Sequence, residues 1–187
     1  IYNSNDVVRA DGVNADALLD GFCVTGGYAR GDDDIGRGAG MRNTNNARPT
    51  VVSCTFSGNF ANVGGGMYNS QSSPTVMSST FSGNTANSGG RMCNDNSSPT
   101  VTNSTFSNNR SEGAGFGGGM YNYNSSPTLT NCTFSRNRQV GYIVFLGDGL
   151  ANMSSSPTVT NCIFWDNCAA DGSDFHASVS AQEVSAG

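Results

Sequence analysis

The stretch "SSPTVTNSTFSNN", from Ser97 to Asn109, is one of five in-phase copies of a single phrase. All five prolines of the chain occupy the same place in it, at spacings of 25, 25, 28 and 30 residues. A Phe stands seven positions after each Pro, and an Asn stands three positions after each Phe. Repeats of roughly 20 to 50 residues are typical of stacked units, none of which buries its apolar face alone.

The apolar positions of each unit indicate short strands rather than helices. Each unit contains a Pro, several Gly and many β-branched residues, which disfavour helix. In "GMYN" the Met would face inward and the Tyr outward, in "TVT" the Val inward, and in "CTF" the Cys and Phe inward. Three short strands in a unit of about 25 to 30 residues predict an all-β fold, a parallel β-helix of about six coils. A degenerate earlier copy, "LDGFCVTGG", begins at Leu19.

Stacking such coils places like residues in columns along the axis. We expect Val and Leu to form one column, Cys and Ser a mixed column, and Asn at the turns to satisfy buried backbone groups. One predicted core ladder is Met41, Met67, Met92, Met120 and Leu150, the second is Phe56, Phe81, Phe106, Phe134 and Phe164, and the main Asn ladder is Asn59, Asn84, Asn109, Asn137 and Asn167.

Two recurring motifs resemble the repeat of the polymorphic outer membrane protein family. "GGGM" (64–67 and 117–120), "GGRM" (89–92) and "GAGM" (38–41) are similar to its GG-x-[aliphatic] half. "FSGN" (56–59 and 81–84), "FSNN" (106–109), "FSRN" (134–137) and "FWDN" (164–167) are similar to its F-x-x-N half. The resemblance implies a right-handed parallel β-helix on a secreted or surface-displayed protein, often an adhesin.

This pattern divides the chain into three parts. Residues 1–36 would form an incomplete first coil and an acidic loop, residues 37–168 the regular coils, and residues 169–187 a tail. The tail stretch "FHASVSAQEVSA" (175–186) alternates loosely, so we expect it to add a strand or a cap, in this subunit or in the next one.

Composition excludes several classes of function. Charged residues make up 12% of the chain, every basic residue is Arg, and the net charge is −5. The absence of a basic run argues against nucleic acid as a partner, and no apolar run approaches the ~18 residues of a membrane span. Six cysteines suit an oxidising compartment, so we expect an extracellular or cell-surface location.

No catalytic constellation is readable in the repeat. Polysaccharide lyases and hydrolases need clustered carboxylates or a comparable acid–base set on one face. The outward positions here are Thr, Ser and Tyr, and the lone His176 has only Asp174 nearby in sequence, which is typical of a solvated pair. The outward Thr columns also resemble the grids of ice-binding solenoids, although Thr is a favoured strand residue in its own right. We therefore predict a protein that is not an enzyme and has no cofactor.

One acidic cluster is a weak candidate for a metal site. Asp32, Asp33 and Asp34 in "GDDDIG" could supply oxygen ligands to Ca²⁺, with Asp11 or Asp16. Neighbouring Asp side chains point in different directions, so a solvated loop tip is the alternative interpretation.

The cysteines leave two alternatives open. Cys54, Cys132 and Cys162 fall in a column where Ser79 and Ser104 also stand, which favours small-residue packing. Cys132 and Cys162 would nevertheless lie on adjacent coils, within the range for a disulfide. Cys162 with Cys168 is another pairing.

The departures from the repeat point to a function in association. Tyr142, Ile143, Val144, Phe145 and Leu146 are five consecutive apolar residues in an expanded turn, and Ile163 and Trp165 replace the outward Thr and Ser of the last copy. Exposed apolar groups of this kind mark contacts, either with another molecule or with the chain's own tail.

We therefore predict a structural protein that associates with itself by end-to-end stacking into a filament. The alternative is a surface adhesin or glycan-binding module, in which Tyr68 and Tyr121 would stack on sugars. An ordinary outer ladder is the other interpretation of these two tyrosines.

Overall fold

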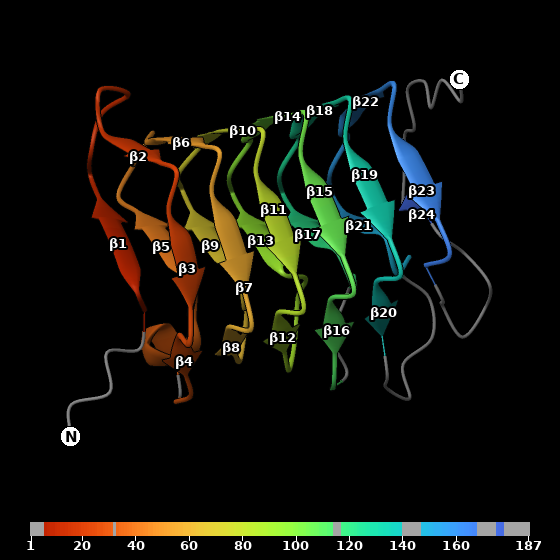
Figure 1. Cartoon of the computed structure of the whole chain (residues 1–187), viewed down its shortest axis with the longest axis horizontal. Helices are drawn as coiled ribbons and strands as arrows, with labels where there is room; N and C mark the ends of the chain where they lie inside the picture. Colours follow the sequence, from red (N-terminus) through yellow and green to blue (C-terminus); the bar gives the residue numbers. More distant parts are fainter. Residues whose placement is uncertain (1–5, 32, 114–116, 140–146, 168–174, 178–187) are drawn as a thin grey trace.

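The computed structural model describes residues 6–31, 33–113, 117–139, 147–167 and 175–177. Four parallel sheets run along a rod of stacked coils, and the one helical element among these residues is the short 3-10 helix η1 (Asp33–Gly36) (Figure 1). Successive strands of a sheet come from successive coils, because each coil contributes one strand to each sheet. The predicted parallel β-helix is confirmed. Among the described residues, five coils contribute a strand to all four sheets and a sixth contributes β21, β22 and β23, so there are about five complete turns rather than six.

Sheet A carries the Met column. Its register pairs Met67 with Met92 and Met92 with Met120, as expected from the in-phase motifs. The strands of sheet A are β1 (Val8–Asp11), β5 (Met41–Thr44), β9 (Met67–Ser70), β13 (Met92–Asp95), β17 (Met120–Tyr123), β21 (Leu150–Met153) and β24 (Phe175–Ala177).

Sheet B carries the Val and Leu column and sheet C the Phe column. Sheet B consists of β2 (Leu18–Asp20), β6 (Thr50–Val52), β10 (Thr75–Met77), β14 (Thr100–Thr102), β18 (Thr128–Thr130) and β22 (Thr158–Thr160). Sheet C consists of β3 (Cys23–Thr25), β7 (Thr55–Ser57), β11 (Thr80–Ser82), β15 (Thr105–Ser107), β19 (Thr133–Ser135) and β23 (Ile163–Trp165).

Sheet D is an addition to the three strands expected per coil. Its strands have two residues each, which is too short for alternation of apolar and polar residues to be read from sequence. They are β4 (Tyr28–Ala29), β8 (Phe60–Ala61), β12 (Thr85–Ala86), β16 (Arg110–Ser111) and β20 (Arg138–Gln139).

The Phe column is a continuous stack of rings. From Phe56 to Phe164 the ring centroids of neighbouring coils are 4.7, 4.8, 4.6 and 4.9 Å apart, and the planes differ by 5° or less. Phe106 in the middle is fully buried, whereas Phe164 in the last coil is only half-buried. The core is therefore densest in the central coils.

Asn ladders hold the turns together, as predicted. The Asn84 side chain donates to the Phe56 backbone carbonyl at 2.9 Å, and the side-chain Oδ1 of Asn109 accepts from the Asn84 backbone amide at 3.1 Å. The same arrangement repeats from coil to coil. A second ladder in sheet A runs from Asn43 through Asn69, Asn94 and Asn122 to Asn152, with amide-to-amide distances of 2.7 or 2.8 Å.

The glycines of the "GGGM" motif permit a tight return to sheet A. Gly64 has a φ of +66°, and a Cβ on Gly65 would collide with the Thr85 carbonyl oxygen of the next coil. Gly65 therefore has no room for a side chain, although the corresponding place in the preceding coil accommodates the buried Ala39.

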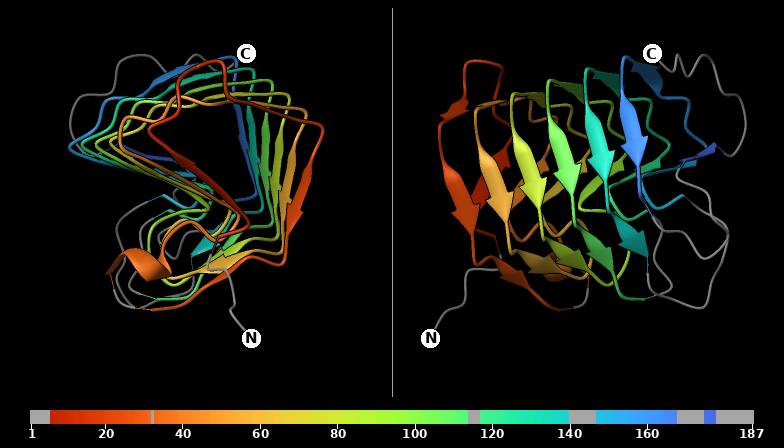
Figure 2. Two further views of the ribbon diagram at one scale, coloured as in Figure 1. Left: turned by 90° about the vertical axis from the view of Figure 1, so that its left-hand side faces the viewer. Right: turned by 45° about the vertical axis from the view of Figure 1, so that its right-hand side comes forward.

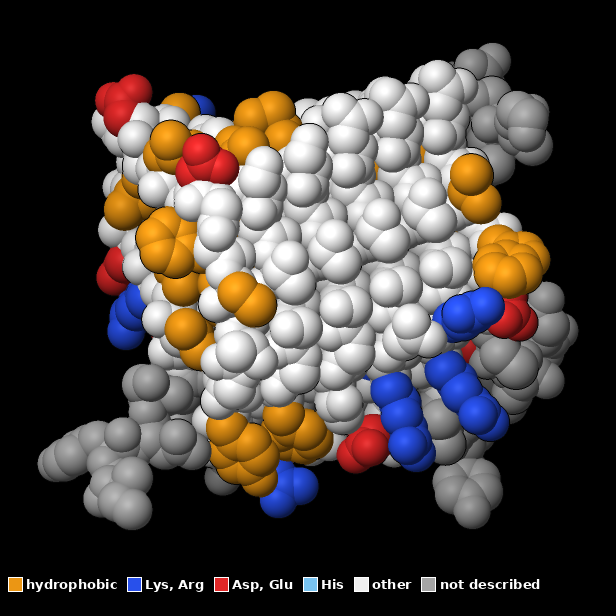
Figure 3. All heavy atoms as spheres, viewed as in Figure 1, with side chains coloured by type: hydrophobic (Ala, Val, Ile, Leu, Met, Phe, Trp, Pro, Cys, Tyr) orange, Lys and Arg blue, Asp and Glu red, His pale blue; other side chains and the backbone are white. Residues whose placement is uncertain are grey.

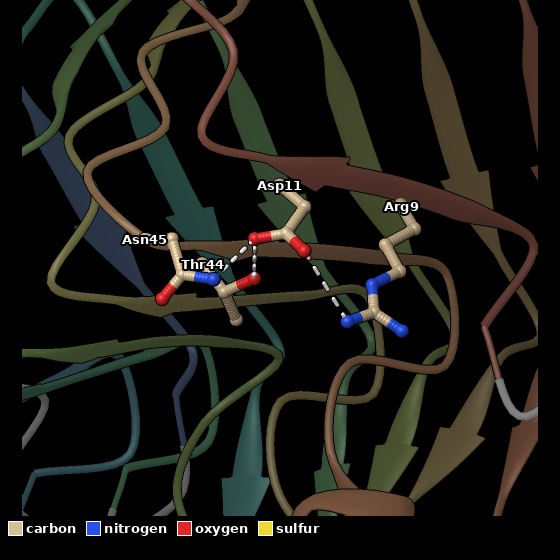
Figure 4. A network of polar contacts seen from close by, with 4 residues as sticks. All are labelled: Arg9, Asp11, Thr44 and Asn45. Carbon is tan, nitrogen blue, oxygen red and sulfur yellow. Dashed lines mark hydrogen bonds and ion pairs between the residues drawn. The ribbon is translucent and has the colours of Figure 1, made fainter.

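The first coil is more complete than the sequence indicated. It supplies β1 to β4, one strand for each sheet. Asp11 connects it to the second coil, because Thr44 Oγ1 donates to the carboxylate at 3.1 Å and Asn45 Nδ2 donates to the same oxygen (Figure 4). Arg9, in the same strand as Asp11, forms an ion pair with the other carboxylate oxygen at 3.5 Å. At the other end the predicted added strand is β24, which pairs with β21 of this same chain.

Seen along the axis, the coil is indented on one side, between a broad part and a smaller lobe (Figure 2). Sheet D and the returning loops form the smaller lobe, and the outer face of sheet A lies at the indentation. This shape gives the rod one concave side, while sheet C forms a broad outer face.

Candidate functional site

Two features of the described residues depart from a plain polar rod. One is apolar exposure at both ends, and the other is a groove on the concave side.

The C-terminal end exposes two bulky apolar residues of β23. Ile163 is 59% exposed and Trp165 58% exposed. They occupy the columns of Thr133 and Ser135, as the sequence indicated. The Arg136 guanidinium lies over the Trp165 ring, 5.3 Å from its centroid, and the indole is still more than half exposed.

The N-terminal end also exposes apolar residues, which the sequence analysis did not identify. Leu18 is 62% exposed and Phe22 59% exposed. The exposure of Leu18 could have been predicted from the repeat, because Leu18 pairs with Thr50 and so occupies an outward place that is Thr in the regular coils. Apolar side chains thus replace outward polar ones at both ends.

The central coils differ from the ends on the outer face of sheet C. Figure 3 shows hydrophobic side chains toward the two ends of this face and uncharged polar surface over the coils between them. In the central coils the outward residues of sheet C are Thr and Ser in matching register. On this face the exposed apolar side chains therefore lie toward the two ends, where β3 and β23 are the outermost strands among the described residues.

The groove lies against the outer face of sheet A and has a volume of about 400 Å³. Its floor includes Tyr68, Cys93 and Tyr121, which are paired side by side in β9, β13 and β17. The complete lining is Arg37, Val63, Tyr68, Cys93, Asp95, Tyr121, Tyr123 and Met153. The volume falls within the roughly 300–1,000 Å³ of ligand pockets, and the lining is mainly apolar, as in such pockets.

A short polar chain crosses the groove. Arg37 Nη1 donates to Tyr68 Oη at 2.8 Å, and Tyr68 Oη donates to Asp95 Oδ2 at 3.1 Å. Burial, followed by the neighbouring Cys93, raises the pKa of Tyr68 to about 12. Burial likewise raises the pKa of Tyr121 to about 12 and that of the Cys93 thiol above its ordinary value. These groups are neutral at physiological pH, so Arg37 and Asp95 supply the charges that line the groove.

The tyrosines that were candidates for sugar stacking are not available for it. Tyr68 is 2% exposed and Tyr121 8% exposed, so each presents too little of its ring to stack face to face on a sugar. They pack with Cys93 and Ala151 in one apolar cluster. Sugar stacking on Tyr68 and Tyr121 is therefore wrong, and the outer-ladder interpretation holds.

Cys132 and Cys162 are free thiols, so the predicted disulfide between them is not formed. Both take the place of Ser in a hydrogen-bonded column. The Cys162 sulfur accepts from the Cys132 backbone amide at 3.4 Å, as Ser104 Oγ does from the Ser79 amide at 3.1 Å. Hydrogen bonding to Cys162, together with burial, raises the pKa of the Cys132 thiol. Cys168, the other proposed partner, lies outside the described residues.

Several candidate residues cannot be placed in this way. Asp32 and the segment Tyr142, Ile143, Val144, Phe145 and Leu146 lie outside the described residues, while Asp33 and Asp34 begin η1. Across the part of the chain that the structure describes, no three His, Cys, Asp or Glu residues gather in a way that would hold a metal ion. The calcium site is thus still only a prediction.

Arg91 is an unexpected buried charge in the central coils. It stands in "GGRM" where "GGGM" has Gly, and it is fully buried. Its Nε donates to the Asn84 carbonyl at 2.6 Å, while its two Nη atoms contact no partner among the described residues. Burial lowers the pKa of Arg91 to about 9, although the nearby carboxylates of Glu112 and Asp148 oppose this shift.

Comparison with known families agrees with this architecture. Residues 37–181, well over half of the chain, match the family described as the right handed beta helix region. The chain belongs to this family. No curated protein and no solved structure gives a match. Membership in the right-handed β-helix family fixes the hand of the coil, which the sequence had indicated only through resemblance. No helix among the described residues is long and apolar enough to span a membrane.

Proposed function

We propose that this β-helix is a structural subunit that associates with itself end to end, outside the cell or on its surface. The supporting observation is the apolar exposure at both ends of the rod, at Leu18 and Phe22 on one side and at Ile163 and Trp165 on the other. Contacts between different ends of identical subunits do not close on themselves, so they generate filaments.

Each of two core columns ends in an apolar residue at both ends of the rod. If β3 of one copy continued sheet C beyond β23 of another, Val24 would stand next to Phe164, because both belong to the Phe column. In sheet B the same continuation would bring Leu19 next to Val159. Such an arrangement would bury the half-buried Leu19 and Phe164. In sheet A it requires β1 of the second copy to take the place of β24 beside β21.

Other considerations favour this role over the alternatives. The resemblance to the polymorphic outer membrane protein repeat and the cysteine content support an extracellular or surface location. The adhesin or glycan-binding role relied on sugar stacking by Tyr68 and Tyr121, and both side chains are buried. A non-enzymatic role is proposed from the Thr, Ser and Tyr character of the outward positions.

The proposal is tested by blocking one end at a time. Leu18→Arg should disable the N-terminal end and Ile163→Arg the C-terminal end, while each leaves the opposite end intact. Thr105→Arg is the matched control, because Thr105 lies in the column of Ile163 but in a central coil. Light scattering after size exclusion would give the mass of each variant as concentration is raised.

We expect the native protein and Thr105→Arg to form large assemblies, and each end variant alone to remain monomeric. An equimolar mixture of the two end variants should form dimers and nothing larger, because one intact N-terminal end meets one intact C-terminal end. A native protein that stays monomeric at millimolar concentration would overturn the proposal, as would end variants that assemble like the control.

A further inference from the structure

The groove on sheet A contains the chemical groups that recognise a methylated cation. Tyr123 is 40% exposed, so unlike Tyr68 it presents part of its ring to the groove. It pairs directly with Asp95 on one side and with Met153 on the other. One accessible aromatic ring, a carboxylate and a thioether therefore lie within neighbouring coils, over the floor formed by Tyr121.

The groove already holds one cation against an aromatic ring. The Arg37 Cζ lies 5.3 Å from the centroid of Tyr68, while its Nη1 donates to the hydroxyl of that ring. This is the distance at which a cation is attracted by the electron-rich face of an aromatic ring. Arg37 is thus bound at the Tyr68 side, which leaves Asp95 as the charge nearest to Tyr123.

The hydrogen bonds of Asp95 determine which cation fits. Its Oδ2 accepts from Tyr68 at 3.1 Å, and its Oδ1 accepts from Asn96 Nδ2 at 2.7 Å. A primary ammonium carries three donors and would lose its hydration in a mainly apolar groove without gaining enough acceptors. A quaternary ammonium has no N–H group, so it needs only a negative charge, aromatic rings and methyl contacts.

We propose that this groove binds a soluble small molecule bearing a trimethylalkylammonium group, with the cation between Tyr123 and Asp95 and the alkyl part over Tyr121 and Met153. The volume of about 400 Å³ suits a small ligand rather than a polymer. The net charge of −5 also favours a cation. This binding is independent of the association through the ends.

Isothermal titration calorimetry with choline chloride is the direct test. Two comparison compounds separate the contributions: ammonium chloride carries the charge without methyl groups, and 3,3-dimethylbutan-1-ol has the shape of choline without the charge. We expect choline to bind at least tenfold more tightly than either compound. Equal binding of choline and the neutral alcohol would show a plain apolar pocket and overturn the proposal, as would no saturable heat with choline.

Variants at the exposed ring provide the matched control. A cation on an aromatic face contributes about 0.5–2 kcal/mol, so Tyr123→Leu should weaken choline binding by about tenfold, whereas Tyr123→Phe keeps the ring and should change it by less than about threefold. Asp95→Asn should also weaken binding by about tenfold while keeping an acceptor for Tyr68. Equal affinities for the Leu and Phe variants would contradict the proposed site. Because Tyr123 is exposed, circular dichroism of all three variants should match the native protein.

Discussion

The central coils and the two ends of the rod are built from the same repeat but face different surroundings. Phe106 is fully buried between Phe81 and Phe134, whereas Phe164 in the last coil is only half-buried. The first outward place of sheet B is Thr in the central coils and Leu18 in the first coil. The outward places of sheet C are Thr and Ser in the central coils and Ile163 and Trp165 in the last. The difference shows that the repeat determines the core, while its departures place apolar side chains at the two ends of the rod.

The largest expected effect distinguishes the centre from the end within one column. Phe106→Ala should lower the free energy of unfolding by about 3–5 kcal/mol, because it removes a fully buried ring and leaves a cavity. Phe164→Ala should cost less than half as much, since the half-buried ring leaves a smaller cavity. Urea unfolding with an unchanged m-value would measure both. Equal losses would mean that the last coil is as well packed as the middle.

The buried charge of the central coils is expected to destabilise them. Arg91→Met should raise the free energy of unfolding by about 1–3 kcal/mol at pH 7, because it removes two buried Nη donors that have no hydrogen-bond partner among the described residues. The Asn84 carbonyl would keep its bond from the Arg110 amide at 3.1 Å.

The pH dependence of this variant provides a second readout. Because burial lowers the pKa of folded Arg91 to about 9, the native protein gains stability as pH rises above that value. The advantage of Arg91→Met should therefore shrink above pH 9. An Arg91→Met protein less stable than the native one at pH 7 would show that Arg91 has a stabilising partner.

An Asn ladder that stops short at the N-terminal end could be extended. The Oδ1 of Asn43 is buried without a partner among the described residues, and the position paired with Asn43 is Ala10. Ala10→Asn should place a donor there and add about 1 kcal/mol of stability. Ala10→Val is the control, since it adds volume without a donor. If both variants change the unfolding midpoint equally, the gain does not come from the ladder.

The smallest expected effect concerns the seam between the first two coils. Hydrogen bonds from Asn45 and Thr44 lower the pKa of Asp11 below its ordinary value of 3.8. Its contribution is therefore present above the unfolded pKa and is lost as pH falls through the lower, folded value. Asp11→Asn should slightly reduce stability at pH 7 and flatten the pH dependence below pH 4. Thermal unfolding between pH 2 and 7 would show an unchanged profile if the seam does not matter.

Much of the fold could be predicted from the sequence, because the same motif recurs in every coil. The columns headed by Met41 and Phe56, and the Asn ladders, follow from spacing alone. The fourth strand was missed, since two residues such as Phe60 and Ala61 carry no period. Arg91 appeared in "GGRM", yet a sequence cannot tell whether such a residue points inward.

The groove shows a different limit. Sequence alternation placed Tyr68 and Tyr121 on the outer face, and this was correct with respect to the core. Their burial depends on returning loops that approach from other parts of each coil, including Arg37 and Val63. Alternation within a strand contains no information on such an approach, so the groove needed the three-dimensional structure.

The most direct test of the proposed end-to-end association is negative-stain electron microscopy of the native protein beside Ile163→Arg. Unbranched filaments one rod wide in the native sample, and isolated short rods in the variant, are the predicted result. Short isolated rods in both samples would contradict it, and would mean that the exposed apolar residues at the ends do not join one copy to the next.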